Sequence, residues 1–237
     1  MLLTGKLGLD LTGSPLALVF GYSMGAMQAL SWARQFPAEV SAAVAVCGAA
    51  VCGGYNHVFL SALDATLTAD PSWDHQIGAY TATPNPANLR AFARIYAGWG
   101  VGSTFYRDEV WRSVGFSSLE DFLVRSYEQG FGSSFEPDLL AQLTTWKSTT
   151  PDPARLAGLG MITARVLLMP CTTDRYFPVD EIASREAALI PGARLVPIDS
   201  PWGHRAGDPG RPGQEVENAF IRNQVHAFLG HPLQSSL

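Results

Sequence analysis

A serine stands between two glycines near the start of the chain, in a pattern that could support covalent catalysis. The segment Gly21-Tyr-Ser-Met-Gly25 follows an apolar run that ends at Phe20, and helix-forming residues come after it. A serine hydroxyl is a weak nucleophile at neutral pH, so it needs a base, and the base needs an orienting carboxylate. Ser23 is therefore a candidate nucleophile. The alternative is a strand-to-helix turn with a bystander serine.

Asp174 and His204 are the candidate acid and base. Each lies a few residues beyond an apolar, strand-like run: 165–169 precedes Asp174, and 194–198 precedes His204. The residues between the two side chains suffice for one helix and one strand, which would bring both to one sheet edge. Asp199 is the competing acid, because it also follows a strand end and lies five residues before His204.

The other histidines and one further acid suit structural roles better. Asp180 is placed to begin a helix, where a carboxylate opposes the positive end of the helix dipole. The histidines other than His204 fall in the middle of the chain or in its last helix and tail. We expect surface or packing roles for them: His57, His75, His226 and His231.

Two neighbours of Ser23 complete the candidate site. The backbone N–H of Met24 could donate to the oxyanion that forms during acyl transfer, and Tyr22 is a candidate substrate-binding residue. Glycine suits positions 21 and 25, because we expect side chains there to collide with the neighbouring strand and helix. A second oxyanion donor would come from an earlier loop, and only 22 residues precede Ser23.

Alternating strand-like and helical runs predict a parallel sheet that positions these side chains. The last helix should bury an apolar stripe that consists of Val216, Phe220, Val225 and Phe228. The same interpretation predicts strands over 15–20, 40–47, 165–169 and 194–198, and helices over 26–35, 179–189 and 214–229.

The middle of the chain differs in amino-acid composition from both ends. It is rich in aromatic residues and glycines, and it contains weak helical patterns over 88–96 and 119–128. We predict a helical cap over 55–150, inserted between two parts of an α/β core over 1–54 and 151–237. Such a cap would cover the carboxyl edge of the sheet, where ligands bind in open α/β folds.

Composition excludes several classes of protein. The chain has 237 residues, a formal net charge of −5, 47% hydrophobic residues and 16% charged residues. It can therefore bury a core, which excludes wholesale disorder, and it lacks the basic patch that a nucleic-acid binder needs. Three cysteines without a CxxC pair or nearby histidine ligands predict no metal site and buried free thiols: Cys47, Cys52 and Cys171.

Two uncharged stretches, 11–33 and 40–63, raise the question of a membrane span. Glycine and proline interrupt the first and glycine, asparagine and histidine the second, so we predict no membrane span and no signal peptide. The expected compartment is the cytoplasm. The C-terminal Ser235-Ser-Leu237 is close to the peroxisomal Ser-Lys-Leu signal, which keeps the peroxisome as an alternative.

Four segments resemble the homoserine O-acetyltransferase-like branch of the α/β-hydrolase superfamily, and the likeness spans nearly the whole chain. The resemblance implies an α/β-hydrolase fold with a mostly parallel sheet, no cofactor, a small-molecule ester or acyl substrate, and an acyl-enzyme on Ser23 with His204 as base and Asp174 as its partner. The segments are 21–28 with Trp32-Ala33 and Phe36-Pro37 behind it, 92–99, 171–178 and 202–207.

The chain departs from the acetyltransferases at the site itself. Those enzymes carry Gly-Gly-Ser-Met-Gly-Gly and an aspartate after the histidine, whereas Tyr22 and Ala26 flank this motif and Arg205 follows His204. The sequence looks more like uncharacterised hydrolases of the branch, including some from fungal toxin clusters. We therefore predict an esterase, with a role in secondary metabolism. The alternative enzyme is an acyl-CoA-dependent O-acyltransferase.

The length before the motif is the second departure. Relatives of this fold place several strands ahead of the nucleophile, so we expect those N-terminal strands to be missing here. An exposed central strand invites association, so a homodimer is one expected assembly. A truncated, non-catalytic homologue is the remaining alternative.

Overall fold

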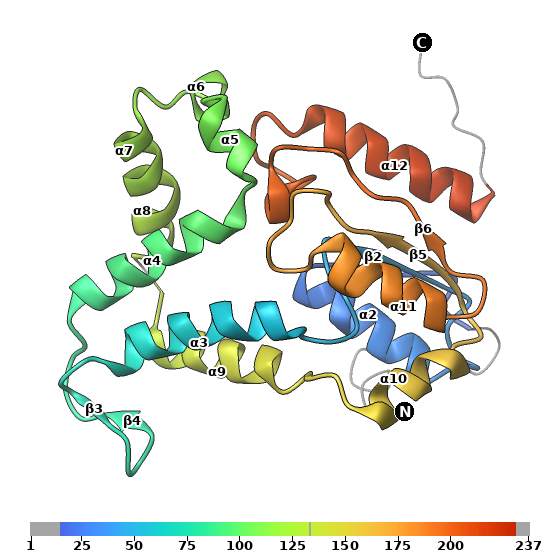
Figure 1. Ribbon diagram of the computed structural model, residues 1–237, viewed down its shortest axis with the longest axis horizontal. Helices are drawn as coiled ribbons and strands as arrows, with labels where there is room; N and C mark the ends of the chain where they lie inside the picture. Colours follow the sequence, from blue (N-terminus) through green and yellow to red (C-terminus); the bar gives the residue numbers. More distant parts are fainter. Residues whose placement is uncertain (1–14, 133, 231–237) are drawn as a thin grey trace.

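A parallel four-stranded sheet, in the right half of Figure 1, forms the core of the computed structural model, which describes residues 15–132 and 134–230. Residues 1–14, His231 and the C-terminal Ser235-Ser-Leu237 lie outside the described residues. The strands follow the order β1-β2-β5-β6, and all three pairings are parallel. Their bounds are Val19–Tyr22 for β1, Ala42–Val46 for β2, Arg165–Met169 for β5 and Arg194–Leu195 for β6.

Parallel neighbours need a crossover between them, and the chain provides three. Helix α2 (Met24–Gln35) joins β1 to β2. The π-helix η3 (Val179–Ala183) and α11 (Ser184–Leu189) join β5 to β6, and the whole middle of the chain is inserted between β2 and β5. This alternation confirms the predicted α/β class with a parallel sheet.

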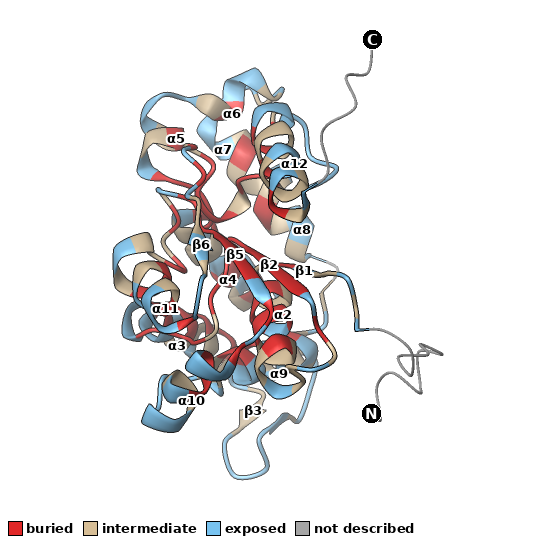
Figure 2. Cartoon of the chain, turned by 90° about the vertical axis from the view of Figure 1, so that its right-hand side faces the viewer, coloured by how far each residue is buried: buried red, intermediate tan, exposed pale blue. Residues whose placement is uncertain are grey.

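Alternate residues of the central strands face two separate helical layers. All five residues of β2 are buried, as expected for a strand covered on both faces. Val44 and Leu167 pack in one cluster with Ile221 of α12 (Glu215–Leu229), whereas Ala43 packs on the opposite face with Leu30 of α2. Figure 2 shows the strands between α12 and α2.

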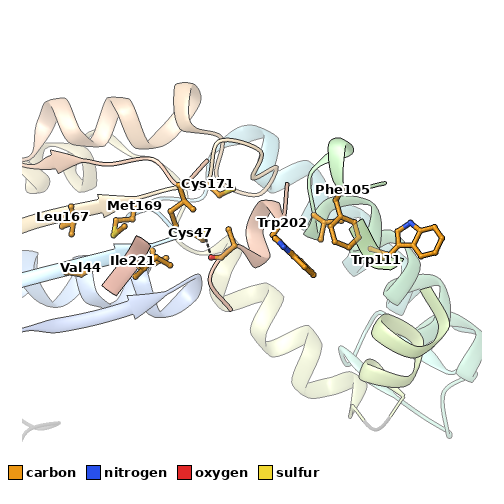
Figure 3. Close-up of a cluster of buried hydrophobic side chains, with 14 of the residues drawn as sticks. Val44, Cys47, Phe105, Trp111, Leu167, Met169, Cys171, Trp202 and Ile221 are labelled. Atoms are coloured by element: carbon orange, nitrogen blue, oxygen red, sulfur yellow. Dashed lines mark hydrogen bonds between the residues drawn. The ribbon is translucent and has the colours of Figure 1, made fainter. Parts of the chain in front are cut away.

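The hydrophobic cluster under α12 continues beyond the sheet. Figure 3 shows it running from Val44 through Cys47 and Trp202 to Phe105 and Trp111. The last two belong to short helices of the middle segment, so one continuous apolar cluster ties that segment to the sheet. Cys47, like Cys52 and Cys171, is a buried free thiol, as predicted.

The middle segment is mainly helical and lies to the left of the sheet in Figure 1. A short antiparallel hairpin, β3 (Trp73–Asp74) with β4 (Ala79–Tyr80), was not predicted from the sequence. The predicted boundaries of the cap, 55 and 150, stay a prediction. The helices are α3 (Gly54–Thr68), α4 (Pro86–Gly100), α5 (Ser103–Arg107), α6 (Val110–Ser113), α7 (Leu119–Phe122), η1 (Leu123–Glu128, a π-helix), α8 (Gln129–Phe131) and α9 (Glu136–Lys147).

Three further short helices lie in the described part of the chain: α10 (Pro153–Ala157), η2 (Gly158–Met161) and η4 (Gly203–Arg205). Within residues 15–132 and 134–230, every helix is too short or too polar to cross a lipid bilayer.

The element bounds differ from the predictions mainly at strand ends. The strand predicted over 165–169 is confirmed residue for residue by β5. The strands predicted over 15–20, 40–47 and 194–198 are shorter or shifted, and their outer parts pair only as isolated bridges, Leu16 with Val40 and Cys171 with Ile198.

The apolar stripe predicted on the last helix is wrong at one position. Val216 is 78% exposed, whereas Glu217 is buried on the face that also buries Ile221 and Phe228. The reason is a polar contact: Ser200 Oγ donates to Glu217 Oε1 at 2.6 Å. A buried glutamate on the inward face cannot be recognised from an apolar pattern.

Candidate active site

Ser23 occupies a strained turn between β1 and α2. Its φ of 56° and ψ of −123° lie in a region that non-glycine residues rarely adopt. Such a conformation costs about 1–3 kcal/mol and is typical of functional sites. Hydrogen bonds hold it in place, because Ser23 N donates to Val46 O at 2.9 Å and Ala26 N donates to Ser23 O at 2.9 Å.

Two close approaches of the backbone require glycine around this turn. A Cβ at Gly21 would lie 1.9 Å from the carbonyl oxygen of Gly25, and a Cβ at Gly48 would lie 2.6 Å from Ser23 O. The collision predicted for Gly25 is wrong, because no atom beyond its own helix lies within 4 Å of a Cβ there. Gly48, in the loop after β2, carried no recognisable motif in the sequence.

The fold brings Ser23, His204 and Asp174 into one hydrogen-bonded chain. His204 Nε2 lies 2.7 Å from Ser23 Oγ, and His204 Nδ1 lies 2.9 Å from Asp174 Oδ2. The competing acid Asp199 is exposed and accepts from Thr172 Oγ1 at 3.2 Å instead. His57 and His75 are exposed on the middle segment, and His226 lies on α12.

Buried contacts fix the orientation of the acid and the histidine. The Asp174 side chain is fully buried, and its Oδ1 accepts from Tyr176 N at 2.7 Å and Phe177 N at 3.3 Å. Its Oδ2 is left for His204, so the imidazole carries its proton on Nδ1 and presents the Nε2 lone pair to Ser23. The Tyr176 ring packs 4.4 Å from the His204 ring, centroid to centroid.

The loop that carries His204 is pressed against the end of α4. Gly102 N donates to Pro201 O at 2.9 Å. Gly203 has a φ of 57°, and a Cβ there would lie 2.7 Å from Gly102 N. Only glycine permits this backbone approach, which locks the histidine loop to the start of α5.

Tyr22 contacts the same loop from the other side. Its hydroxyl donates to the backbone oxygen of His204 and lies 3.4 Å from Ala206 O. Burial raises the pKa of the Tyr22 hydroxyl well above its usual range, so it remains a donor. The structure thus directs the polar end of Tyr22 into the protein, where it contacts the histidine loop, and a contact of Tyr22 with substrate stays a prediction.

Met24 is the first residue of α2, directly after Ser23. The first N–H groups of a helix have no partner within the helix, and the helix dipole makes this end positive. The Met24 N–H is therefore available to an oxyanion formed at the serine.

Glu186 of α11 is a buried residue that sequence reasoning missed. It is 2% exposed, and it accepts from Ala50 N at 2.8 Å and Val51 N at 3.0 Å. These donors lie in the loop after β2 that begins with Gly48, so the carboxyl anchors the loop that packs on Ser23. Burial raises the pKa of Glu186 to about 7, although the two backbone N–H groups oppose the rise.

This raised pKa predicts a pH-dependent stability. Between the ordinary pKa of 4.5 and about 7, the folded chain binds a proton that the unfolded chain releases, so the free energy of unfolding falls as pH rises. The Glu186 contribution is at most one proton, or about 1.4 kcal/mol per pH unit. In urea unfolding at pH 5, 6 and 7, the free energy of unfolding should fall less steeply with pH for Glu186→Gln than for the parent. Equal slopes would contradict the assignment.

A cavity of about 290 Å³ opens beside His204, between the histidine loop and the helices of the middle segment. Its lining includes Tyr96, Tyr127 and Phe131 from those helices and Arg205 from the loop. A larger cavity of about 840 Å³, between the β3-β4 hairpin and α9, contains none of the three hydrogen-bonded side chains. We regard the smaller cavity as the candidate substrate site because it alone of the two reaches His204.

Among the residues that the structure describes, no group of three or more His, Cys, Asp or Glu side chains is arranged to hold a metal ion.

Comparison with known proteins matches residues 3–207 to the family described as the alpha/beta hydrolase fold. A Corynebacterium glutamicum protein named a probable esterase is 33% identical over 78% of this chain and 54% of its own length. An ethyl acetate hydrolase from Pseudomonas veronii is 31% identical over 99% of this chain and 64% of its own. A homoserine O-acetyltransferase from Methanocorpusculum labreanum is 27% identical over 93% of this chain and 47% of its own.

A solved structure of the acetyl esterase MekB superposes with a TM-score of 0.78 at 31% identity, and covers 96% of this chain and 64% of its own. The chain therefore belongs to the α/β-hydrolase family, in the branch that includes the homoserine O-acetyltransferases. It spans less than two thirds of the length of these relatives.

Proposed function

We propose that this chain hydrolyses carboxylic esters of small molecules through an acyl-enzyme on Ser23. The observation that carries the proposal is the chain of hydrogen bonds from Asp174 through His204 to Ser23. The names of two relatives, an esterase and an ethyl acetate hydrolase at 31–33% identity, support ester hydrolysis.

The geometry suits a two-step reaction. His204 Nε2 takes the proton of Ser23, and the serine oxygen attacks the ester carbonyl carbon. The Met24 N–H donates to the resulting oxyanion, and the alcohol leaves with the proton held by His204. Water, activated by His204, then attacks the acyl-serine and releases the acid. Asp174 holds the imidazole in the required tautomer and stabilises its protonated form.

Residues 55–150 would serve as the cap that shapes the entrance to Ser23, as their position beside the histidine loop suggests. A role in secondary metabolism and a homodimer stay predictions.

Acyl transfer to an alcohol is the second candidate function. It is favoured by the relatives named homoserine O-acetyltransferase, and it uses the same acyl-enzyme. The two reactions differ in whether water or an alcohol accepts the acyl group. Arg205, in place of the aspartate that follows the histidine in those acetyltransferases, favours hydrolysis.

Turnover of 4-nitrophenyl acetate distinguishes these functions. Hydrolysis predicts release of one acetate per nitrophenol, with no need for an added alcohol. A transferase would need the alcohol, accept acetyl-coenzyme A as donor and form an O-acetyl product. Absence of nitrophenol release from the folded chain, both with and without an added alcohol, would contradict both enzymes and favour the non-catalytic alternative.

A further inference from the structure

Arg205 is a half-buried cation that has no ion-pair partner among residues 15–132 and 134–230. It follows His204 directly and lines the cavity of about 290 Å³. Its Nη1 donates to Ser126 Oγ at 3.2 Å, and none of the ion pairs found in the described part of the chain includes it. A guanidinium has five N–H donors, so most of them are left for another acceptor.

The Tyr127 hydroxyl is an unsatisfied polar group in the same cavity. The residue is 4% exposed, its hydroxyl has no hydrogen-bond partner of ordinary geometry among the residues described, and the Arg205 guanidinium lies over its ring, 5.5 Å from the centroid. Buried polar groups normally have a partner, so an orphaned hydroxyl calls for an explanation. A Cβ at Gly100 would lie 2.7 Å from the Tyr127 oxygen, so the hydroxyl packs closely against the Gly100 backbone.

The charges around the cavity leave a positive surplus. Arg211 and Asp208 also line it, and Arg211 Nε pairs with Asp208 Oδ2 at 2.7 Å. Among the charged side chains that line the cavity, Arg205 is therefore the one without an ionic partner, and the Asp174 carboxylate lies behind His204, outside the lining. A guanidinium fork and a phenol O–H together form a donor set that fits a carboxylate.

We propose that this cavity recognises an ester substrate that carries a carboxylate, with Arg205 as the anion-binding residue and Tyr127 as a second hydrogen-bond donor. The proposal rests on the proposed function for the position of the ester carbonyl at Ser23. The anion site itself can be measured without turnover. The carboxylate belongs either to the acyl part or to the alcohol part of the ester, and substrates can separate these two sources.

Binding of 4-hydroxybenzoate, compared with its neutral isostere 4-hydroxybenzamide, tests the anion site by calorimetry. The parent should bind the carboxylate about 10- to 100-fold more tightly than the amide, in keeping with charge-assisted hydrogen bonds. Arg205→Met should abolish this preference, Arg205→Lys should retain part of it, and Tyr127→Phe should weaken binding several-fold. Arg125→Met is the matched control, because Arg125 lies on the same helix as Tyr127 but outside the cavity lining.

Turnover separates the two sources of the carboxylate. A higher kcat/KM for 4-acetoxybenzoate than for phenyl acetate places the charge in the alcohol, and a higher value for phenyl hemisuccinate places it in the acyl group. Hydrolysis of phenyl acetate without any preference for a carboxylate, or a preference that survives in folded Arg205→Met, would overturn this inference and leave the proposed function standing. Arg205-dependent binding of the carboxylate without turnover of any ester would contradict the proposed function and leave the anion site supported.

Discussion

Replacing Ser23 with alanine is expected to lower the kcat/KM for 4-nitrophenyl acetate by about 10⁴- to 10⁶-fold. Ser23 Oγ lies 2.7 Å from the histidine base, on a backbone turn that projects it at the start of α2. Without that oxygen no acyl-enzyme forms, and the remaining groups can only polarise the carbonyl or position water. The loss should appear in kcat, because the hydroxyl acts in the chemical step.

Ser31→Ala is the matched control for this substitution. Ser31 lies on the same helix, and its Oγ accepts from Gln35 Nε2 at 2.6 Å on the exposed side. It should keep the activity of the parent. Because alanine retains the same backbone conformation as serine, thermal unfolding of Ser23→Ala should resemble that of the parent. A Ser23→Ala protein with more than a tenth of the parent activity would contradict the role of Ser23.

Replacing Asp174 with asparagine is expected to lower kcat by about 10⁴-fold. One oxygen of Asp174 accepts from the backbone of Tyr176, and the amide oxygen of asparagine can retain that bond. The amide nitrogen would then face His204 Nδ1 as a donor. The imidazole would move its proton to Nε2, where it could no longer accept the proton of Ser23.

Asp199→Asn is the control that tells the two acids apart. Asp199 is exposed and bonded to Thr172, so its substitution should leave kcat unchanged. A large loss in Asp199→Asn together with near-normal activity in Asp174→Asn would reverse the assignment of the acid.

The parts of the site that follow from local sequence were predictable. Residues 15–35 contain, in order, a buried strand, a glycine-flanked serine and a run of helix-forming residues. Each of these has a local signature in the sequence. Asp174 and His204 follow two further strands, and the parallel topology carries all three chain segments to one edge. Topology thus converted three local predictions into one spatial site.

Other features depend on contacts that no local pattern records. The Tyr22 hydroxyl meets the backbone of a residue 182 positions away, and Glu186 meets Ala50 from 136 positions away. Glu186 lies within an ordinary helical sequence, so nothing marks it as buried. Gly48 likewise becomes necessary only because α2 packs on it. These positions are defined by tertiary packing.

Peptide mapping after reaction with a fluorophosphonate examines the central claim most directly, since the reagent phosphonylates a serine only when a base activates it. The account predicts one adduct on the peptide that contains Ser23, no adduct in Ser23→Ala, and much slower labelling in Asp174→Asn. Equal labelling of Ser23→Ala and the parent, or no adduct at all on the folded parent, would contradict it.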